Sequence, residues 1–296
     1  MSKDKRAAGF AVLAAALYAV SSPVSKLLLQ DIPPAMMAAL LYLGAGAGML
    51  AFGLIRKGSG RGKKEQRLTR RELPYTIGMI VLDIAAPFCL MFGLRMTSAA
   101  NASLLNNFEI VATSLIALLV FKEKISARLW TAIGLVTVSS IILSVEDVNS
   151  FSFSIGSVLV LLACICWGFE NNCTRMLSCK NPLEIVIIKG FGSGSGSLLL
   201  AFATGERVTG VSYIAAALLL GFAAYGLSIF FYVYAQRELG AAKTSAYYAV
   251  APFIGVLLSL VMFRELPPLS FFIALLIMIA GVVLTLKDQK MQKEGE

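Results

Sequence analysis

Long apolar stretches recur along almost the whole chain, and they constrain its fold more than any other feature. Each is bounded by charged or turn-forming residues. They lie at residues 7–29, 34–55, 74–95, 99–121, 127–145, 153–174, 182–203, 211–235, 242–263 and 268–286. A helix needs roughly 20 apolar residues to cross about 30 Å of hydrocarbon, and each stretch is about that long. We therefore predict an all-α membrane protein with ten transmembrane helices.

The composition leaves room for little else. Of the 296 residues, 58% are hydrophobic and only 15% are charged, and the mean hydropathy of +0.79 lies outside the range of soluble domains. Ten spans use about 200 residues, so no soluble catalytic domain fits beside them. Five cysteines without histidine show no metal-ligand spacing. We expect no metal site, no cofactor and neither zinc nor Ser-His-Asp catalysis.

The first apolar stretch follows Lys3, Lys5 and Arg6, which is also the pattern of a cleaved signal peptide. An internal repeat, described below, pairs this stretch with a helix in the middle of the chain. A discarded peptide would have no reason to match that helix, so we keep the stretch as the first span.

The basic residues predict an orientation. With the N-terminus in the cytoplasm, 21 of the 26 Lys and Arg residues lie on the cytoplasmic side and only Arg95, Arg207 and Arg264 lie outside. Both termini are then cytoplasmic, and the location is the plasma or inner membrane. The net charge of +9 is concentrated in the loop at residues 56–71. Its place beside the bilayer favours attraction to anionic lipid, not to nucleic acid.

The two halves of the chain resemble each other. Tyr18-Ala19 matches Trp167-Gly168 at an offset of 149 residues, and the Gly44-x-Gly46-x-Gly48 run matches Gly192-x-Gly194-x-Gly196 at 148. A third block, from Arg95 to Ser126, matches residues 237–268 at an offset of 142. We divide the chain into two repeats, residues 1–148 with spans one to five and residues 149–296 with spans six to ten.

Each repeat has an odd number of spans, so the second one enters the membrane from the opposite side. Inverted repeats are a recurring architecture of secondary transporters, in which binding sites lie near the midplane between the repeats. The matched glycines Gly44, Gly48, Gly192 and Gly196 are interpreted as helix-packing positions, because small residues let helix backbones approach closely. A phosphate loop fits poorly, since no strand precedes the second run.

Three further marks carry a family resemblance. They are Trp167-Gly168, the Glu109 and Ala251-Pro252 positions within spans four and nine, and the pair of span ends Phe121-Lys122-Glu123 and Phe263-Arg264-Glu265. With these marks, nearly the whole chain resembles the ten-helix EamA-type proteins of the drug/metabolite transporter superfamily. The resemblance implies export or exchange of small metabolites, amino acids or drugs, with a central cavity built from spans one, three, four, six, eight and nine.

The sequence departs from that family pattern in places. Tyr18-Ala19 replaces an aromatic-glycine pair, and Ile110 stands where proline is common. Leu41-Tyr42 occupies the region of span two where a basic residue often stands, although Lys189 keeps one in span seven. Substrate assignments made within the family therefore do not carry over to this chain.

Ionisable residues inside spans are costly and usually face a cavity or a partner. Asp83 and Glu109 lie about 14 and 15 Å from the ends of their spans at 1.5 Å per residue, which places both near the midplane. We expect the two carboxylates to lie near each other, with Glu109 as the coupling residue. The alternatives are a structural carboxylate paired with Lys189 for Glu109, and for Asp83 a role in satisfying backbone donors freed by Pro87.

Other candidates surround these acids. Asn106 and Asn107 accompany Glu109 in span four, and hydrogen bonding between helices is the alternative reading for both. In span six, Trp167 and Glu170 share a helix face, and Glu170 is close enough to the boundary to snorkel.

At the offset of 142, the first-half positions Asp83, Leu105 and Asn106 correspond to Tyr225, Tyr247 and Tyr248. Carboxylates that face tyrosine rings favour an organic cation or amine, because ring faces attract cations. Ordinary packing of the three tyrosines is the alternative. Glu123 and Glu265, at helix ends beside basic residues, are interpreted as structural ion pairs.

These features predict a secondary transporter, an exporter or exchanger, for a small organic metabolite, an amino acid or an amine-bearing drug-like cation. No Walker-type sequence is present, so an ion, the membrane potential or a counter-substrate must supply the driving force, and a proton is the simplest choice. The alternative is a non-transporting membrane protein, such as an intramembrane enzyme or an assembly partner. Two midplane acids without histidine are few reactive groups for an enzyme. Substrate, direction and oligomeric state stay open at this stage.

Overall fold

Apolar helices make up nearly all of the structure. The computed structural model describes residues 3–58, 66, 68–121, 126–147, 152–177, 180–239 and 247–294. The first half contains α1 (Lys3–Ala19), α2 (Ser21–Leu28), α3 (Pro34–Gly58), η1 (Arg70–Glu72), α4 (Leu73–Met96), α5 (Ala99–Leu105), α6 (Phe108–Phe121), α7 (Ala127–Ser144) and β1 (Val145–Asp147). The second half contains β2 (Ser152–Phe153), α8 (Ile155–Leu177), α9 (Pro182–Ala203), α10 (Val211–Gly221), η2 (Phe222–Leu227), α11 (Ser228–Leu239), α13 (Ala251–Phe263) and α14 (Leu269–Glu294).

Eight helical segments within the described residues are long and apolar enough to cross a membrane, and the helices Ala251–Phe263 and Leu269–Leu284 are shorter apolar ones. The ninth predicted span, 242–263, begins among residues outside the described part of the chain. Eight spans of sufficient length agree with the prediction, whereas a total of ten crossings stays a prediction.

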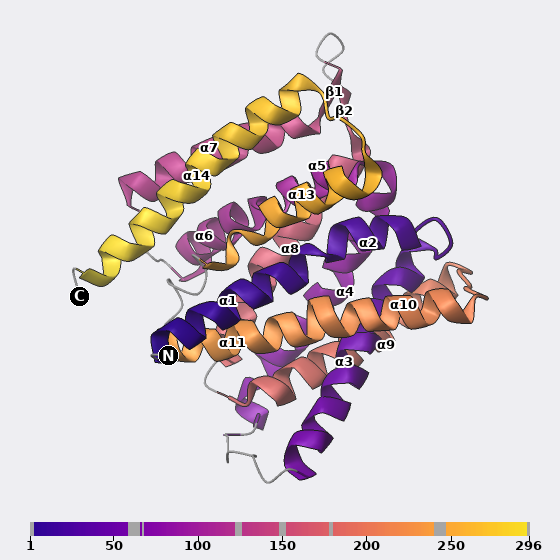
Figure 1. Ribbon diagram of the computed structural model, residues 1–296. Coiled ribbons are helices and arrows are strands. Elements are labelled where there is room, and N and C mark those ends of the chain that lie inside the picture. The colour runs from indigo at the N-terminus through magenta and orange to yellow at the C-terminus, as the bar shows by residue number, and fades with distance from the viewer. Residues whose placement is uncertain are drawn as a thin grey trace.

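The two halves run through the bundle in opposite directions. In Figure 1 the start of α1 and the end of α14 lie at the same end of the bundle, which we call the termini face. The β1–β2 hairpin lies at the other end, which we call the hairpin face. Because α8 follows this hairpin directly, it starts at the hairpin face, whereas α1, its counterpart in the first half, starts at the termini face.

A short pair of strands lies between the two helical halves, and the fold class stays all-α as predicted. β1 and β2 pair antiparallel, with Val145 opposite Phe153 and Asp147 opposite Ser152. The backbone N–H of Ser154 donates to the carbonyl of Ser144 at 2.7 Å beside the pair. The chain has left its helix here, so its backbone groups find partners across the turn instead of along a helix.

The main helix pairs join one half of the chain to the other. α3 packs against α9, α4 against α8, α1 against α11 and α7 against α14. A large cluster of buried side chains contains residues from both halves, among them Leu41, Leu90, Trp167 and Tyr225. The halves therefore share one core and are not separate bodies.

Polarity is reversed relative to a soluble protein. Asp83, Glu170 and Lys189 are buried, with 0%, 2% and 6% of their surfaces exposed. Leu119 and Val261, on the outside of the bundle, are 74% and 73% exposed. An apolar exterior around a charged interior suits a protein whose solvent is lipid.

Several helices are interrupted near the middle of the bundle. Span one breaks at Val20, between α1 and α2, and span four breaks at Asn106 and Asn107, between α5 and α6. A matching turn at residues 249–250 precedes α13, and η2 forms a π-helical segment between α10 and α11. Irregular backbone at membrane depth is tolerated where it is buried in protein or lines a cavity, and π-segments often mark functional sites.

Candidate functional site

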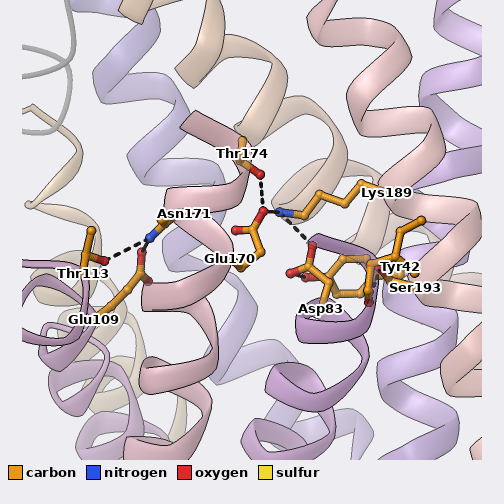
Figure 2. A network of polar contacts seen from close by, with 10 residues as sticks. Tyr42, Asp83, Glu109, Thr113, Glu170, Asn171, Thr174, Lys189 and Ser193 are labelled. Carbon is orange, nitrogen blue, oxygen red and sulfur yellow. Dashed lines mark hydrogen bonds and ion pairs between the residues drawn. The ribbon is translucent and has the colours of Figure 1, made fainter. Parts of the chain in front are cut away.

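A buried ion triad links three helices at the centre of the bundle (Figure 2). The ammonium of Lys189 on α9 lies 3.0 Å from a carboxylate oxygen of Asp83 on α4 and 3.0 Å from one of Glu170 on α8. Asp83 comes from the first half of the chain and the other two residues come from the second. One ammonium shared between two carboxylates offsets much of the cost of burying the three charges.

Hydroxyl groups complete the triad. The hydroxyl of Tyr42 donates to the second carboxylate oxygen of Asp83 at 2.9 Å, and that of Thr174 donates to Glu170. Two alternatives from the sequence are wrong. Glu170 does not snorkel, because it is 2% exposed and ion-paired. The partners of Asp83 are side chains, and α4 runs unbroken through Pro87, so backbone donors freed at Pro87 do not explain Asp83.

Glu109 belongs to a second, neighbouring cluster. Its carboxylate accepts a hydrogen bond of 2.5 Å from the amide of Asn171, which also donates to the hydroxyl of Thr113 at 3.4 Å. In Figure 2, Asn171 points toward Glu109 and Thr113, while Glu170 points toward Lys189 and Asp83. Consecutive positions of α8 thus serve two clusters, because successive residues on a helix are about 100° apart.

This arrangement corrects two expectations for the acids. Asp83 and Glu109 lie in different clusters, one on each side of α8, and do not form a carboxylate pair. Lys189 forms its ion pairs with Asp83 and Glu170, not with Glu109. Among the described residues, Glu109 has no salt bridge and is only half-buried.

Four tyrosines form a continuous group beside both clusters. The ring of Tyr225 lies 5.2 Å from that of Tyr42 and 6.0 Å from that of Tyr18, and the ring of Tyr18 lies 5.8 Å from that of Tyr248. Tyr18 and Tyr248 both lie within electrostatic range of Glu109. Tyr247 differs from the others, since 41% of its surface is exposed. The structure therefore brings Tyr225 and Tyr248 to the site and leaves Tyr247 exposed.

The break in span four leaves polar atoms without partners. Ser103, Asn106 and Asn107 are buried, and the hydroxyl of Ser103 and both side-chain carbonyl oxygens accept no hydrogen bond from the described residues. The amide of Asn107 donates to the carbonyl of Leu104 at 3.3 Å, within its own span. This contact is not the interhelical bond that the alternative reading required. Buried acceptors of this kind are available to a ligand or to water.

The other predicted site residue of span six, Trp167, is 6% exposed and packs in the main apolar cluster. Its position one turn before Glu170 puts it beside the triad in sequence, but its described environment is that of a core residue. Among the described residues, no group of histidine, cysteine, aspartate and glutamate side chains could hold a metal ion.

The predicted glycine positions lie at helix contacts. A Cβ atom at Gly44 would overlap the backbone oxygen of Leu218 on α10, and one at Gly48 would overlap the ring of Phe222 on η2. At Gly192 and Gly196 the added atom would meet the side chains of Ile80 and Ile84 on α4, at 2.7 Å in the first case.

Close backbone approaches also occur at glycines outside the predicted set. A Cβ at Gly190 would overlap the backbone of Gly46, and one at Gly194 would lie 2.7 Å from the backbone nitrogen of Leu43. α3 and α9 therefore touch backbone to backbone.

The basic and acidic residues at the hairpin face form a structural cluster. The ammonium of Lys26 donates to the carbonyls of Leu94, Arg95 and Thr97 at 2.6, 3.1 and 2.7 Å, and so caps the end of α4. Glu265 lies within electrostatic range of Lys26. Glu123, its counterpart in the first half, lies outside the described residues.

Sequence reasoning missed three site residues. Tyr42 was noted only as a departure from the family pattern, and Asn171 was not among the candidates. Lys189 was paired with Glu109 instead of with Asp83 and Glu170. One signal was available for Lys189, since an ammonium deep in a span needs a carboxylate of matching depth, and Asp83 and Glu170 both qualify.

Comparisons with known proteins agree with this architecture. The model of the EamA-like transporter family matches residues 5–145 and, separately, residues 154–287. A protein of Methanothermobacter thermautotrophicus that is named an uncharacterized transporter is 23% identical over 289 residues, which cover 92% of this chain and 83% of that protein. A crystal structure described only as that of a protein shares the fold, with a TM-score of 0.68, 18% identity and coverage of 94% of this chain and 95% of its own.

The two family matches together contain every helix that contributes to the ion triad and to the Glu109 cluster. They also separate at the hairpin, where the direction of the chain through the bundle inverts. The chain therefore belongs to the EamA-like transporter family and is a multi-pass membrane transporter.

Proposed function

We propose that this transporter exchanges a small organic cation, an amine-bearing metabolite or drug, for protons. It uses its two repeats, residues 1–148 and 149–296, as an inverted pair around a midplane site. The observation that carries the proposal is Glu109. It is a half-buried carboxylate at membrane depth with amide and hydroxyl partners but, among the described residues, no cationic one.

The tyrosines support a cationic substrate. Tyr18 and Tyr248 lie within electrostatic range of Glu109, and their rings continue through Tyr225 to Tyr42. Ring faces attract cations within about 6 Å of the centroid, so a substrate amine at Glu109 gains both counter-charge and ring contacts. Asp83 and Glu170 are less suited to this role, because both already contact the ammonium of Lys189.

Glu109 also suits proton exchange. A carboxylate in a low-dielectric site is costly without a counter-charge, so it binds a proton when the substrate cation leaves and releases it when the cation returns. Occupancy of one carboxylate then alternates between proton and substrate. Such alternation couples a proton gradient to movement of the cation in the opposite direction.

Binding measurements on the purified protein test the substrate class. Choline and phenethylamine, as cationic probes, should raise the melting temperature more than their neutral isosteres, since a bound ligand stabilises the folded state by RT ln(1 + [L]/Kd). Counterflow of the best labelled probe in proteoliposomes then tests transport itself. Equal stabilisation by the neutral isosteres would contradict a cation site at Glu109.

We further propose that the termini face is cytoplasmic in a plasma or inner membrane. Half of the basic loop at 56–71, which motivates this orientation, lies outside the described residues, as do Gly60 and Asn149. Gln66 and Thr209 are described and exposed, and they lie on opposite faces. In a cysteine-free background, Gln66→Cys should react with an impermeant maleimide only from the cytoplasm, and Thr209→Cys only from outside. Reversed labelling would overturn the orientation.

A further inference from the structure

The ion triad has a symmetry-related counterpart on the other side of the midplane. The repeat offsets of 149, 148 and 142 carry Ser21, Leu41 and Asp83 onto Glu170, Lys189 and Tyr225. In the structure, Ser21 donates a hydrogen bond of 3.2 Å to the hydroxyl of Tyr225, and Ser21 and Tyr225 are 2% and 3% exposed. The contact between Glu170, Lys189 and Asp83 thus corresponds to a neutral contact between Ser21 and Tyr225.

The two contacts lie at matching depths from opposite faces. Glu170 is seven residues before the end of α8, and Lys189 is seven residues after the start of α9, both measured from the termini face. Ser21 is seven residues before the end of α2, and Leu41 is seven residues after the start of α3, both measured from the hairpin face. Seven residues correspond to about 10 Å, so Glu170 and Lys189 lie nearer the termini face and Ser21 lies nearer the hairpin face, while their partners Asp83 and Tyr225 lie deeper in the bundle.

We propose that these contacts are the two barriers of the transport cycle, with the Asp83–Lys189–Glu170 triad closing the pathway toward the termini face and the Ser21–Tyr225 contact closing it toward the hairpin face. The proposal rests on the transport activity of the family but not on the substrate class. Both barriers are formed and buried in this structure.

The barriers differ in how they respond to loss of one group. Removing one member of a buried ion cluster leaves an uncompensated charge, which strongly destabilises the closed arrangement. Removing one hydroxyl from a neutral pair costs only a single hydrogen bond. The termini-side barrier therefore depends on charge balance, whereas the hairpin-side barrier is weak and insensitive to charge.

Tyr42 connects the two barriers. Its hydroxyl donates to Asp83, and its ring lies 5.2 Å from that of Tyr225. When Asp83 moves, Tyr42 moves with it, and this displacement changes the ring contact between Tyr42 and Tyr225. Opening of one barrier therefore changes the packing of the other.

Cys164 on α8 provides a buried reporter thiol. It is fully buried, and its thiol donates to the carbonyl of Leu105 at 3.6 Å, at the break in span four. In a variant that retains Cys164 as its single cysteine, an impermeant methanethiosulfonate reagent is applied from either side of oriented membrane vesicles. No substrate is required, so failure of the organic-cation proposal leaves this experiment valid.

Lys189→Met should raise the rate of Cys164 modification from the termini face by about tenfold or more, because loss of a charge-assisted contact is worth at least that factor. Modification from the hairpin face should not change. Lys189→Arg should restore the slow rate. Tyr225→Phe should produce a smaller increase, about threefold, from the hairpin face only.

Two further variants make the test decisive. Ser139→Ala removes a hydrogen bond to the carbonyl of Ala274 between α7 and α14 and should change neither rate. If Lys189→Met does not yield folded protein, the double variant Asp83→Asn/Glu170→Gln decides, since it leaves the Lys189 ammonium without a counter-charge. Unchanged termini-side modification in a folded triad variant, or an increase from the hairpin face, would overturn the assignment of the barriers.

Discussion

The two halves of the bundle repeat one helix plan but place different chemistry at equivalent positions. Asp83 and Glu109 in the first half correspond to Tyr225 and Ala251 in the second, and Leu41 corresponds to Lys189. The halves agree at glycines where helices touch, and they differ where polar groups meet. Packing thus follows the symmetry of the repeat, while the charge distribution breaks it.

The glycine contacts show that even the packing is not fully symmetric. Gly44 abuts the backbone of Leu218, whereas its counterpart Gly192 abuts the flexible end of the Ile80 side chain. A backbone neighbour cannot move aside, and a side chain can adopt another rotamer. The contact of α3 with α10 is therefore rigid, and the equivalent contact of α9 with α4 can adjust.

The largest expected effect tests whether Glu109 has a role in coupling that its counterpart Ala251 lacks. Glu109→Gln keeps the acceptor that binds Asn171 but removes the exchangeable charge, so it should abolish accumulation driven by a pH gradient while the protein still folds. Ala251→Ser, the counterpart control, should leave that accumulation near the wild-type rate. Uptake is measured in proteoliposomes with an imposed pH gradient. Wild-type uptake by the Gln variant would exclude Glu109 as the coupling residue and direct attention to Asp83 and then Glu170.

A second prediction compares how much stability is lost when a methyl group is added at Gly44 and at Gly192. Gly44→Ala should lower the free energy of unfolding by about 1–3 kcal/mol, since the new methyl group overpacks against backbone. Gly192→Ala should cost clearly less because Ile80 can move. Gly192→Leu, which exceeds the available space, should lower stability or lock one conformation. Thermal unfolding in detergent compares the three variants, and equal losses for the two alanine variants would contradict a rigid and an adaptable contact.

The smallest expected effect separates two tyrosines at related depths. Tyr225→Phe removes the hydrogen bond by which Ser21 holds the ring in place beside the other tyrosines, and the loss of this positioning bond of about 1 kcal/mol should weaken binding of the cationic probe by about threefold to tenfold. Tyr247→Phe, on an exposed side chain, should leave affinity unchanged. Titration calorimetry measures both. A loss of affinity in the Tyr247 variant alone would reverse the placement of the two rings.

Much of the fold could be predicted because membranes impose simple rules. An apolar stretch of sufficient length forms a helix since lipid offers no partner for backbone groups, and the repeat offsets then order the helices into two inverted halves. Eight of the predicted spans are helical segments long enough to cross. The hairpin between Val145 and Phe153 was missed because its few residues carry no periodic pattern.

The candidate site could be predicted only as a collection of residues. Helical spacing correctly placed Asp83, Asn106, Asn107 and Glu170 inside the bundle, because each interrupts an apolar span. Spacing does not predict which helices cross. The same depth for Asp83 and Glu109 suggested that they meet, and the position of α8 separates them.

The sequence alone therefore determined the class of protein, the positions of most spans, the inverted repeat and the depth of each charged group, because these depend on distance along a helix and on the cost of burial in lipid. Only the tertiary structure decided that Lys189 joins Asp83 to Glu170, that Glu109 is left to Asn171, and that Tyr247 lies outside the site. Those pairings depend on the rotation and crossing of helices, which arise from contacts between residues far apart in the chain.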